Sequence, residues 1–123
     1  NLMPTFTMAN DVPAAHLSHD PTVVTTYDVD PLNHHVATAR WGTEILAAQT
    51  RTLDRAGELT TPVLVLYAGD DQIADPQGSA LFYERIKLTD KTAHRYDGYY
   101  HEIFNEMDKD TVFRDLEVWL AMR

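Results

Sequence analysis

Two short segments of the chain carry the residues that could do chemistry together. The first, Gly69-Asp70-Asp71-Gln72-Ile73-Ala74-Asp75, holds three carboxylates, and the second is Gly98-Tyr99-Tyr100-His101-Glu102. A carboxylate beside an imidazole is the orienting half of an acyl-transfer triad. The carboxylate accepts the hydrogen bond from Nδ1–H and stabilises the imidazolium, while Nε2 takes the proton from a hydroxyl nucleophile. The two segments therefore indicate a mechanism in which His101 acts as the base.

Three carboxylates compete for the role of orienting acid. Asp70 directly follows an apolar run and is placed to cap the turn through an Asx-type hydrogen bond. Asp75 precedes Pro76 and suits the N-cap of a following helix. Asp71 has no obvious local role, so the residues alone give a partial preference for it.

Each segment follows a stretch with the features of a strand. Residues 62–69 form a nearly continuous apolar run, which is typical of a parallel strand covered by helices on both faces. Residues 91–97 predict a shorter, more polar strand. Right-handed crossover between the two strands then places Asp71 and His101 at the same edge of the sheet, beyond the strand ends.

Two helices are expected in this half of the chain. One follows Asp75-Pro76, and the other is an amphipathic helix over roughly residues 108–122. The side chains expected to face inward are Leu81, Phe82 and Ile86 from the first, and Val112, Leu116, Trp119 and Leu120 from the second. The order strand, helix, strand, helix predicts an α/β fold, over residues 57–123.

Residues 1–56 differ in composition, being rich in Ala, Thr, His, Asp and Pro, and predict a helical layer with no convincing strand. Asp20-Pro21 reads as an N-cap with proline at the first helical position, followed by a short apolar face. Asp30-Pro31 repeats that signal and predicts the start of a longer helix ending near Gly57. The short apolar face of the first helix consists of Val23, Val24 and Tyr27, and the residues expected to be buried in the second helix are Val36, Trp41, Ile45 and Leu46.

Composition excludes several classes of function. Ten Lys and Arg against nineteen Asp and Glu give a formal charge of −9, which argues against nucleic acid or an anionic membrane surface as the main partner. The chain has no cysteine, so disulfides, thiolate zinc sites and cysteine nucleophiles are excluded. No stretch reaches the roughly 18 apolar residues of a membrane span. No charged-then-apolar leader opens the chain.

The apolar strand raises a physical difficulty. Two parallel strands cannot bury such a run on both faces and both edges, and open sheets usually carry about four to six strands. We therefore expect the chain to be a fragment, with further strands supplied by another chain or by additional sequence.

The two segments resemble the acid and histidine loops of the monoacylglycerol lipase and lysophospholipase branch of the α/β-hydrolases. Residues 62–79 read PVLVLYAGDDQIADPQGS, and residues 96–106 read YDGYYHEIFNE. In the family pattern the triad acid stands four residues before a second Asp, which implies Asp71 as the acid with Asp75 as the second. His101 is implied as the base. Residues 20–35, DPTVVTTYDVDPLNHH, are similar to the helical cap of bacterial members.

The resemblance implies a fold and a division of the chain. The chain would be the C-terminal part of an α/β-hydrolase, with residues 1–56 as part of the cap and residues 57–123 as part of the core. The family nucleophile lies on a G-x-S-x-G elbow, and the order is Ser, then Asp, then His. No such pentapeptide occurs here, since Ser18 and Ser79 are flanked differently. The oxyanion-hole segment is absent as well, so the chain alone is expected to be inactive.

Several other residues have candidate roles. The stripe of Trp41, Ile45 and Leu46 is expected either as helix core or, as the cap resemblance implies, as the roof of an acyl-chain channel. Ile73 would then be a pocket residue near the scissile ester. Glu106 is expected either in a solvated loop or as a brace for the histidine loop. The four histidines of the N-terminal region do not have metal-site spacing, so no metal is expected; they are His16, His19, His34 and His35.

The function that the sequence favours is hydrolysis of monoacylglycerol or lysophospholipid-like esters, without a cofactor. The partner would be an N-terminal half that carries the serine and the oxyanion hole. The resemblance implies a cytoplasmic or peripherally membrane-associated, bacterial-like protein. Three alternatives stay open: a related peptidase, thioesterase or acyltransferase; a truncated, non-catalytic binding module; and a proteolytic product of an ordinary full-length enzyme.

Overall fold

A pair of parallel strands forms the centre of the C-terminal half. The computed structural model describes residues 3–10 and 12–123. Strand β3 (Val63–Ala68) pairs with β4 (Lys91–Tyr96), and the register runs from Val63 opposite Lys91 to Ala68 opposite Tyr96. Apolar and β-branched residues fill β3, as suits a pleated strand. The predicted parallel pairing is confirmed, and both strands end at the same edge.

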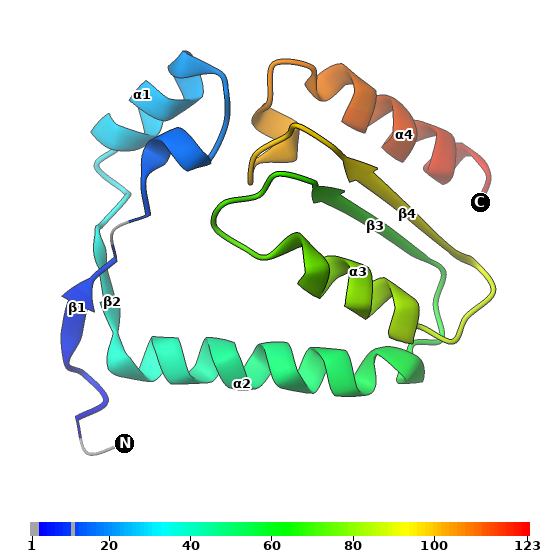
Figure 1. Ribbon diagram of the computed structural model, residues 1–123, viewed down its shortest axis with the longest axis horizontal. Coiled ribbons are helices and arrows are strands. Elements are labelled where there is room, and N and C mark those ends of the chain that lie inside the picture. Colours follow the sequence, from blue (N-terminus) through cyan, green and yellow to red (C-terminus); the bar gives the residue numbers. More distant parts are fainter. Residues whose placement is uncertain (1–2, 11) are drawn as a thin grey trace.

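Helices α3 (Pro76–Arg85) and α4 (Lys109–Ala121) lie on either side of this strand pair (Figure 1). Residues from both strands pack with the histidine loop and with α4 into a small buried cluster, made of Ala68, Tyr96, Ile103 and Val112. Val112 and Ile86 are buried as predicted. Two predicted inward residues are not: Leu81 is 37% exposed and Leu120 is 55% exposed.

Helix α1 (Pro21–Val29) begins where the sequence predicts. Asp20 is its N-cap, and the carboxylate accepts a hydrogen bond of 2.8 Å from the N–H of Thr22. Pro21 occupies the first helical position, where its missing N–H costs nothing. A short 3-10 turn, η1 (Ala14–His16), precedes the helix.

The second Asp-Pro pair does not open a helix, and that prediction was wrong. Asp30 ends α1, and its carboxylate accepts a hydrogen bond from the N–H of Leu32, which makes an Asx-type turn instead. Helix α2 (Ala39–Arg55) begins only after Thr38, whose hydroxyl accepts from the N–H of Trp41. The predicted stop at Gly57 falls inside a 3-10 turn, η2 (Ala56–Glu58), that follows α2.

The expectation of an N-terminal region without strands was also wrong. Strand β1 (Thr7–Ala9) pairs antiparallel with β2 (Val36–Thr38). Each strand has only three residues, too short for a period-2 pattern to stand out. Val36, predicted to be buried in a helix, therefore lies in β2 and is 47% exposed.

The apolar stripe of α2 faces solvent in this chain. The prediction that it packs as helix core was wrong for the residues described, because Trp41 is 55% exposed, Ile45 41% and Leu46 64%. Figure 1 shows α2 as a long helix below α3, running from the β1–β2 pair toward the base of β3. No helix in the described part of the chain is both long and apolar enough to cross a membrane.

Gly69 allows the loops after β3 and β4 to approach each other. A Cβ at this position would lie 2.6 Å from Asp97 Oδ1 and 2.8 Å from Asp97 Cα. The N–H of Gly69 donates to the carbonyl of Tyr96 at 2.7 Å, and the N–H of Asp70 donates to that of Tyr99 at 3.1 Å. The segments that follow β3 and β4 thus remain bonded to each other beyond the sheet.

We expect Gly69→Ala to destabilise the protein that carries this chain, by about 1–3 kcal/mol, because the methyl group overlaps backbone that cannot move aside. Gly78→Ala is the matched control: Gly78 lies in α3, and a Cβ there has no neighbour within 4 Å. That control should be neutral or stabilising by up to about 1 kcal/mol. Chemical denaturation measures both, and equal stabilities of the two variants would contradict the close approach.

Candidate active site

The acid loop, residues 69–75, is folded around the carboxylate of Asp71. Oδ1 accepts two backbone hydrogen bonds, from the N–H of Ile73 at 2.8 Å and from the N–H of Ala74 at 2.9 Å. This arrangement closes the loop into a tight Asx-type turn. The other oxygen, Oδ2, is left free to face the histidine loop.

Asp71 therefore has the local role that the sequence had suggested for Asp70. Asp70 is exposed, and its backbone N–H, rather than its carboxylate, bonds the neighbouring loop at the carbonyl of Tyr99. Asp75 caps α3 as predicted, because its carboxylate accepts a hydrogen bond of 2.9 Å from the N–H of Gln77.

The histidine loop, residues 98–106, turns sharply at its first residue. Gly98 has φ of +81°, a left-handed conformation that glycine adopts without strain. The loop then runs beside the chain preceding α1. The N–H of His101 donates to the carbonyl of His16 at 3.4 Å, and the N–H of Glu102 donates to the carbonyl of Leu17 at 2.8 Å.

Asp71 and His101 lie in contact. Nδ1 of His101 donates to Oδ2 of Asp71 at 2.8 Å, since an ionised carboxylate can only accept. The Asp71 side chain is 11% exposed and the His101 side chain is 40% exposed. Within the described residues no hydrogen bond engages His101 Nε2, so this nitrogen is open to a proton donor.

The Asp71 carboxyl is stabilised in its charged form. Burial by itself raises its pKa, but hydrogen bonds from Ala74 N–H, from His101 and from Ile73 N–H oppose this effect. Together with the charge attraction of His101 they lower the pKa below the ordinary 3.8. Asp71 is therefore an anion at neutral pH, as an imidazolium-stabilising group must be.

An open hollow of about 440 Å³ lies beside the pair. Asp71 and His101 are part of its wall, and so is Ser79 of α3. Most of the remaining wall comes from β3, from the acid loop and from the residues after His101: Leu66, Tyr67, Ala68, Ala74, Glu102, Ile103, Phe104 and Asn105. A mostly apolar hollow beside an acid–base pair is the usual form of a small-molecule site.

The residues expected to bind substrate lie elsewhere. Ile73 is half-buried in the acid loop but is not part of the wall of this hollow. Trp41 and Ile45 lie on the exposed face of α2, outside the hollow as well. Their role in substrate binding stays a prediction.

Glu106 lies in the histidine loop and is 3% exposed. Oε1 accepts from the N–H of Tyr100 at 2.7 Å and from Nδ1 of His19 at 2.9 Å. Burial raises the pKa of Glu106, but the Tyr100 N–H, the His19 side chain and the His19 N–H hold it below the ordinary 4.5. The alternative of a solvated loop position for Glu106 is therefore wrong.

Sequence reasoning missed His19. In the sequence, His19 stands only as one of four histidines without metal-site spacing. Its partner is 87 positions away, so no local pattern could reveal the pair. In the described residues no three metal-ligating side chains come together.

Asp71 and Glu106 predict a pH dependence of stability. Both pKa values are lowered in the folded chain, so an unfolded carboxylate takes up a proton at a pH where the folded one resists it. Their contribution to the free energy of unfolding is fully present above the ordinary values of 3.8 and 4.5. It is lost as the pH falls through the folded values.

Thermal unfolding of the protein that carries this chain, followed from pH 7 to pH 3, measures this loss. Glu106→Gln should flatten the decline below about pH 4.5. Glu117→Gln, which changes an exposed carboxylate of α4, should leave the decline unchanged. Parallel declines in the wild type and Glu106→Gln would contradict a stabilised Glu106 anion.

The sequence is similar to a family of hydrolases and to individual monoacylglycerol lipases. The family model described as "Serine aminopeptidase, S33" matches residues 1–108. The monoacylglycerol lipase of Mycolicibacterium smegmatis is 33% identical over 106 residues, covering 85% of this chain and 38% of that protein. Human monoglyceride lipase is 33% identical over 110 residues, covering 87% of this chain and 36% of that protein.

The structure shows the same relationship. A crystal structure of a monoacylglycerol lipase from Paleococcus ferrophilus matches with a TM-score of 0.91 and 31% identity, covering 97% of this chain and 47% of that chain. This chain therefore spans between about a third and a half of the length of these relatives.

Proposed function

The chain belongs to the serine aminopeptidase S33 family of α/β-hydrolases, and we propose that it supplies the acid and the base of a serine ester hydrolase. Asp71 is the triad acid and His101 the triad base. The nucleophilic serine and the oxyanion hole come from an N-terminal part of the hydrolase, outside this sequence.

One observation carries the proposal: the hydrogen bond of 2.8 Å from His101 Nδ1 to Asp71 Oδ2 at the wall of an apolar hollow. This bond fixes which ring nitrogen carries the proton. Nε2 is then the free base that can remove a proton from a serine hydroxyl. The half-exposed ring allows a group outside the described residues to reach it.

The two serines of the chain are poor candidates for the nucleophile. Ser18 is 2% exposed, and its hydroxyl donates to the carbonyl of Asn105 at 2.9 Å. Ser79 lies in the wall of the hollow, yet no hydrogen bond joins it to His101 within residues 3–10 and 12–123. A nucleophile must lie within about 2.6–3.2 Å of its base in the working complex, which favours a serine from elsewhere.

The reaction proceeds in two steps. His101 Nε2 takes the serine proton as the oxygen attacks the ester carbonyl, and the tetrahedral intermediate expels the alcohol, which receives that proton from His101. A water molecule then attacks the acyl-enzyme with His101 again as the base, which releases the fatty acid and regenerates the serine. Asp71 stabilises the imidazolium in both steps.

Monoacylglycerols are the substrate class that the relatives favour. The Mycolicibacterium smegmatis and Paleococcus ferrophilus proteins are described as monoacylglycerol lipases. The apolar side of the hollow includes Leu66, Ile103 and Phe104, which suits the alkyl part of a single-chain ester. The family description also includes aminopeptidases, and the same pair of residues serves peptide hydrolysis.

A serine-reactive fluorophosphonate tests the proposal on the protein that carries this chain. Intact-mass analysis should find one adduct on a serine outside residues 1–123. His101→Ala should abolish labelling, and Asp71→Asn should lower kcat for a monoacylglycerol by about 10⁴-fold, because the wrong tautomer is favoured. Asp70→Asn, a change of an adjacent exposed carboxylate, should label and turn over as the wild type does.

Other outcomes would overturn the proposal. If the Asp71→Asn protein labels and hydrolyses normally, the chain is a non-catalytic binding module. If labelling is normal but only aminoacyl amides are turned over, the acid–base pair is correct and the ester substrate is wrong.

A further inference from the structure

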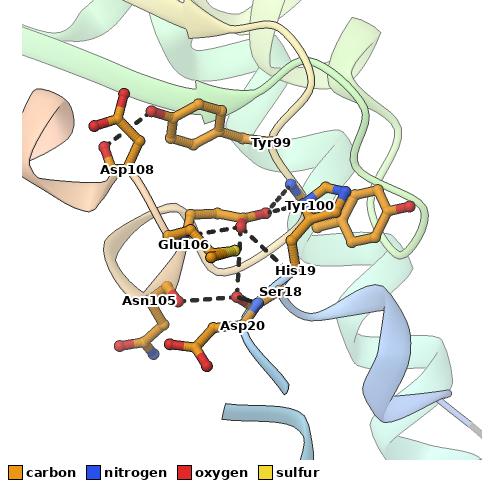
Figure 2. A network of polar contacts seen from close by, with 9 residues as sticks. Ser18, His19, Asp20, Tyr99, Tyr100, Asn105, Glu106 and Asp108 are labelled. Carbon is orange, nitrogen blue, oxygen red and sulfur yellow. Dashed lines mark hydrogen bonds and ion pairs between the residues drawn. The ribbon is translucent and has the colours of Figure 1, made fainter. Parts of the chain in front are cut away.

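A second buried carboxylate joins the start of the cap region to the histidine loop. Figure 2 shows Glu106 pointing between His19 and Tyr100, with Ser18 below it. Oε1 receives hydrogen bonds from Tyr100 N–H at 2.7 Å and from His19 Nδ1 at 2.9 Å. Oε2 receives bonds from the N–H of His19 at 3.1 Å and of Met107 at 3.3 Å.

Tyr100, the residue immediately before His101, is held from two directions. Its N–H is bonded to Glu106, and its ring stacks on the ring of His19 with centroids 3.8 Å apart and planes at 28°. His19 itself is bonded to Glu106 through both its backbone N–H and its ring. Glu106, His19 and Tyr100 thus each contact the other two, with Tyr100 contributing its backbone N–H to Glu106 and its ring to His19.

The backbone reinforces this connection. The carbonyl of His16 accepts from His101 N–H, and the carbonyl of Leu17 accepts from Glu102 N–H. The hydroxyl of Ser18 donates to the carbonyl of Asn105 at 2.9 Å. Residues 16–19, which we call the cap-entry segment, therefore lie bonded along the histidine loop.

We propose that Glu106 is a positioning residue for His101, and that His19 of the cap-entry segment holds it in place. The proposal rests on the function proposed above. Glu106 fixes the backbone at Tyr100 and so fixes where the His101 ring points. His19, the other partner of Glu106, belongs to the cap-entry segment. The position of the His101 ring therefore depends on that segment staying bonded to the histidine loop.

The chemistry of the contacts favours this role over simple stabilisation of a loop. A carboxylate buried to 3% exposure is costly unless hydrogen bonds satisfy it. Here the donors are the N–H of Tyr100, directly before the base, the N–H of Met107, and both the backbone N–H and the ring of His19 from a distant segment. Small displacements of a catalytic group, of about 1 Å, lower rates by about 10²-fold, so a shift at Tyr100 is measurable in turnover.

His19 offers a matched pair of substitutions. His19→Phe keeps an aromatic ring to stack on Tyr100 and removes the Nδ1 donor. His19→Asn removes the ring and keeps an N–H donor near the position of Nδ1. With about 44% of the His19 side chain exposed, both variants should fold, whereas Glu106→Gln alters a buried group directly.

The test is steady-state turnover of a monoacylglycerol by the protein that carries this chain. We expect Glu106→Gln to lower kcat about 10- to 100-fold with little change in KM. His19→Phe should lower kcat roughly three- to tenfold, and His19→Asn should retain most of the wild-type kcat. Glu117→Gln, on the exposed face of α4, is the carboxylate control and should match the wild type.

A spectroscopic readout separates positioning from stability. The ring ¹H–¹⁵N signals of His101, assigned by their loss in His101→Ala, should shift in His19→Phe and return toward wild type in His19→Asn. If His19→Phe and Glu106→Gln lower only the melting temperature, and leave kcat and the His101 signals unchanged, Glu106 is a structural residue and the inference is wrong.

The two proposals fail in different ways. If Asp71→Asn and His101→Ala abolish turnover while His19→Phe and Glu106→Gln do not alter it, the function stands and the positioning role fails. If Asp71→Asn and His101→Ala leave turnover intact, the proposed function fails, and the positioning role fails with it.

Discussion

The hydrogen bond from His101 Nδ1 to Asp71 Oδ2 depends on what holds the other oxygen of that carboxylate. Oδ1 is bonded by the N–H groups of Ile73 and Ala74, so the turn that shapes the acid loop also aims Oδ2 at the imidazole. The same backbone bonds keep the carboxylate ionised, because they lower its pKa. The turn that closes the acid loop therefore also orients the Asp71 carboxylate toward His101 and favours its charged form.

The histidine loop is likewise shaped by a carboxylate that accepts backbone hydrogen bonds, in this case that of Glu106. Glu106 is buried, and no Arg or Lys in residues 3–10 and 12–123 pairs with it; backbone N–H groups and the His19 side chain satisfy it. Gly69 lets the two loops come within bonding distance of each other. Two carboxylates and one glycine thus place Asp71 and His101 together at the common edge of β3 and β4.

The sequence predicted what local chemistry and topology determine. The apolar run of β3, the Asp20-Pro21 and Asp75-Pro76 helix starts and the parallel βαβ order are all visible in residue types. The turn at Asp30-Pro31 could not be recognised from the residue types, because an Asp-Pro pair suits a turn as well as an N-cap. The contact between His19 and Glu106 joins residues 87 positions apart, so only the tertiary fold could reveal it.

A structure of the fluorophosphonate adduct of the protein that carries this chain would test the central claim most directly. The account predicts that the phosphonylated oxygen belongs to a serine outside residues 1–123. It also predicts that His101 Nε2 lies within about 2.6–3.2 Å of that oxygen, with Nδ1 still bonded to Asp71. An adduct on a serine remote from His101 would contradict the assignment of Asp71 and His101 as the acid and base.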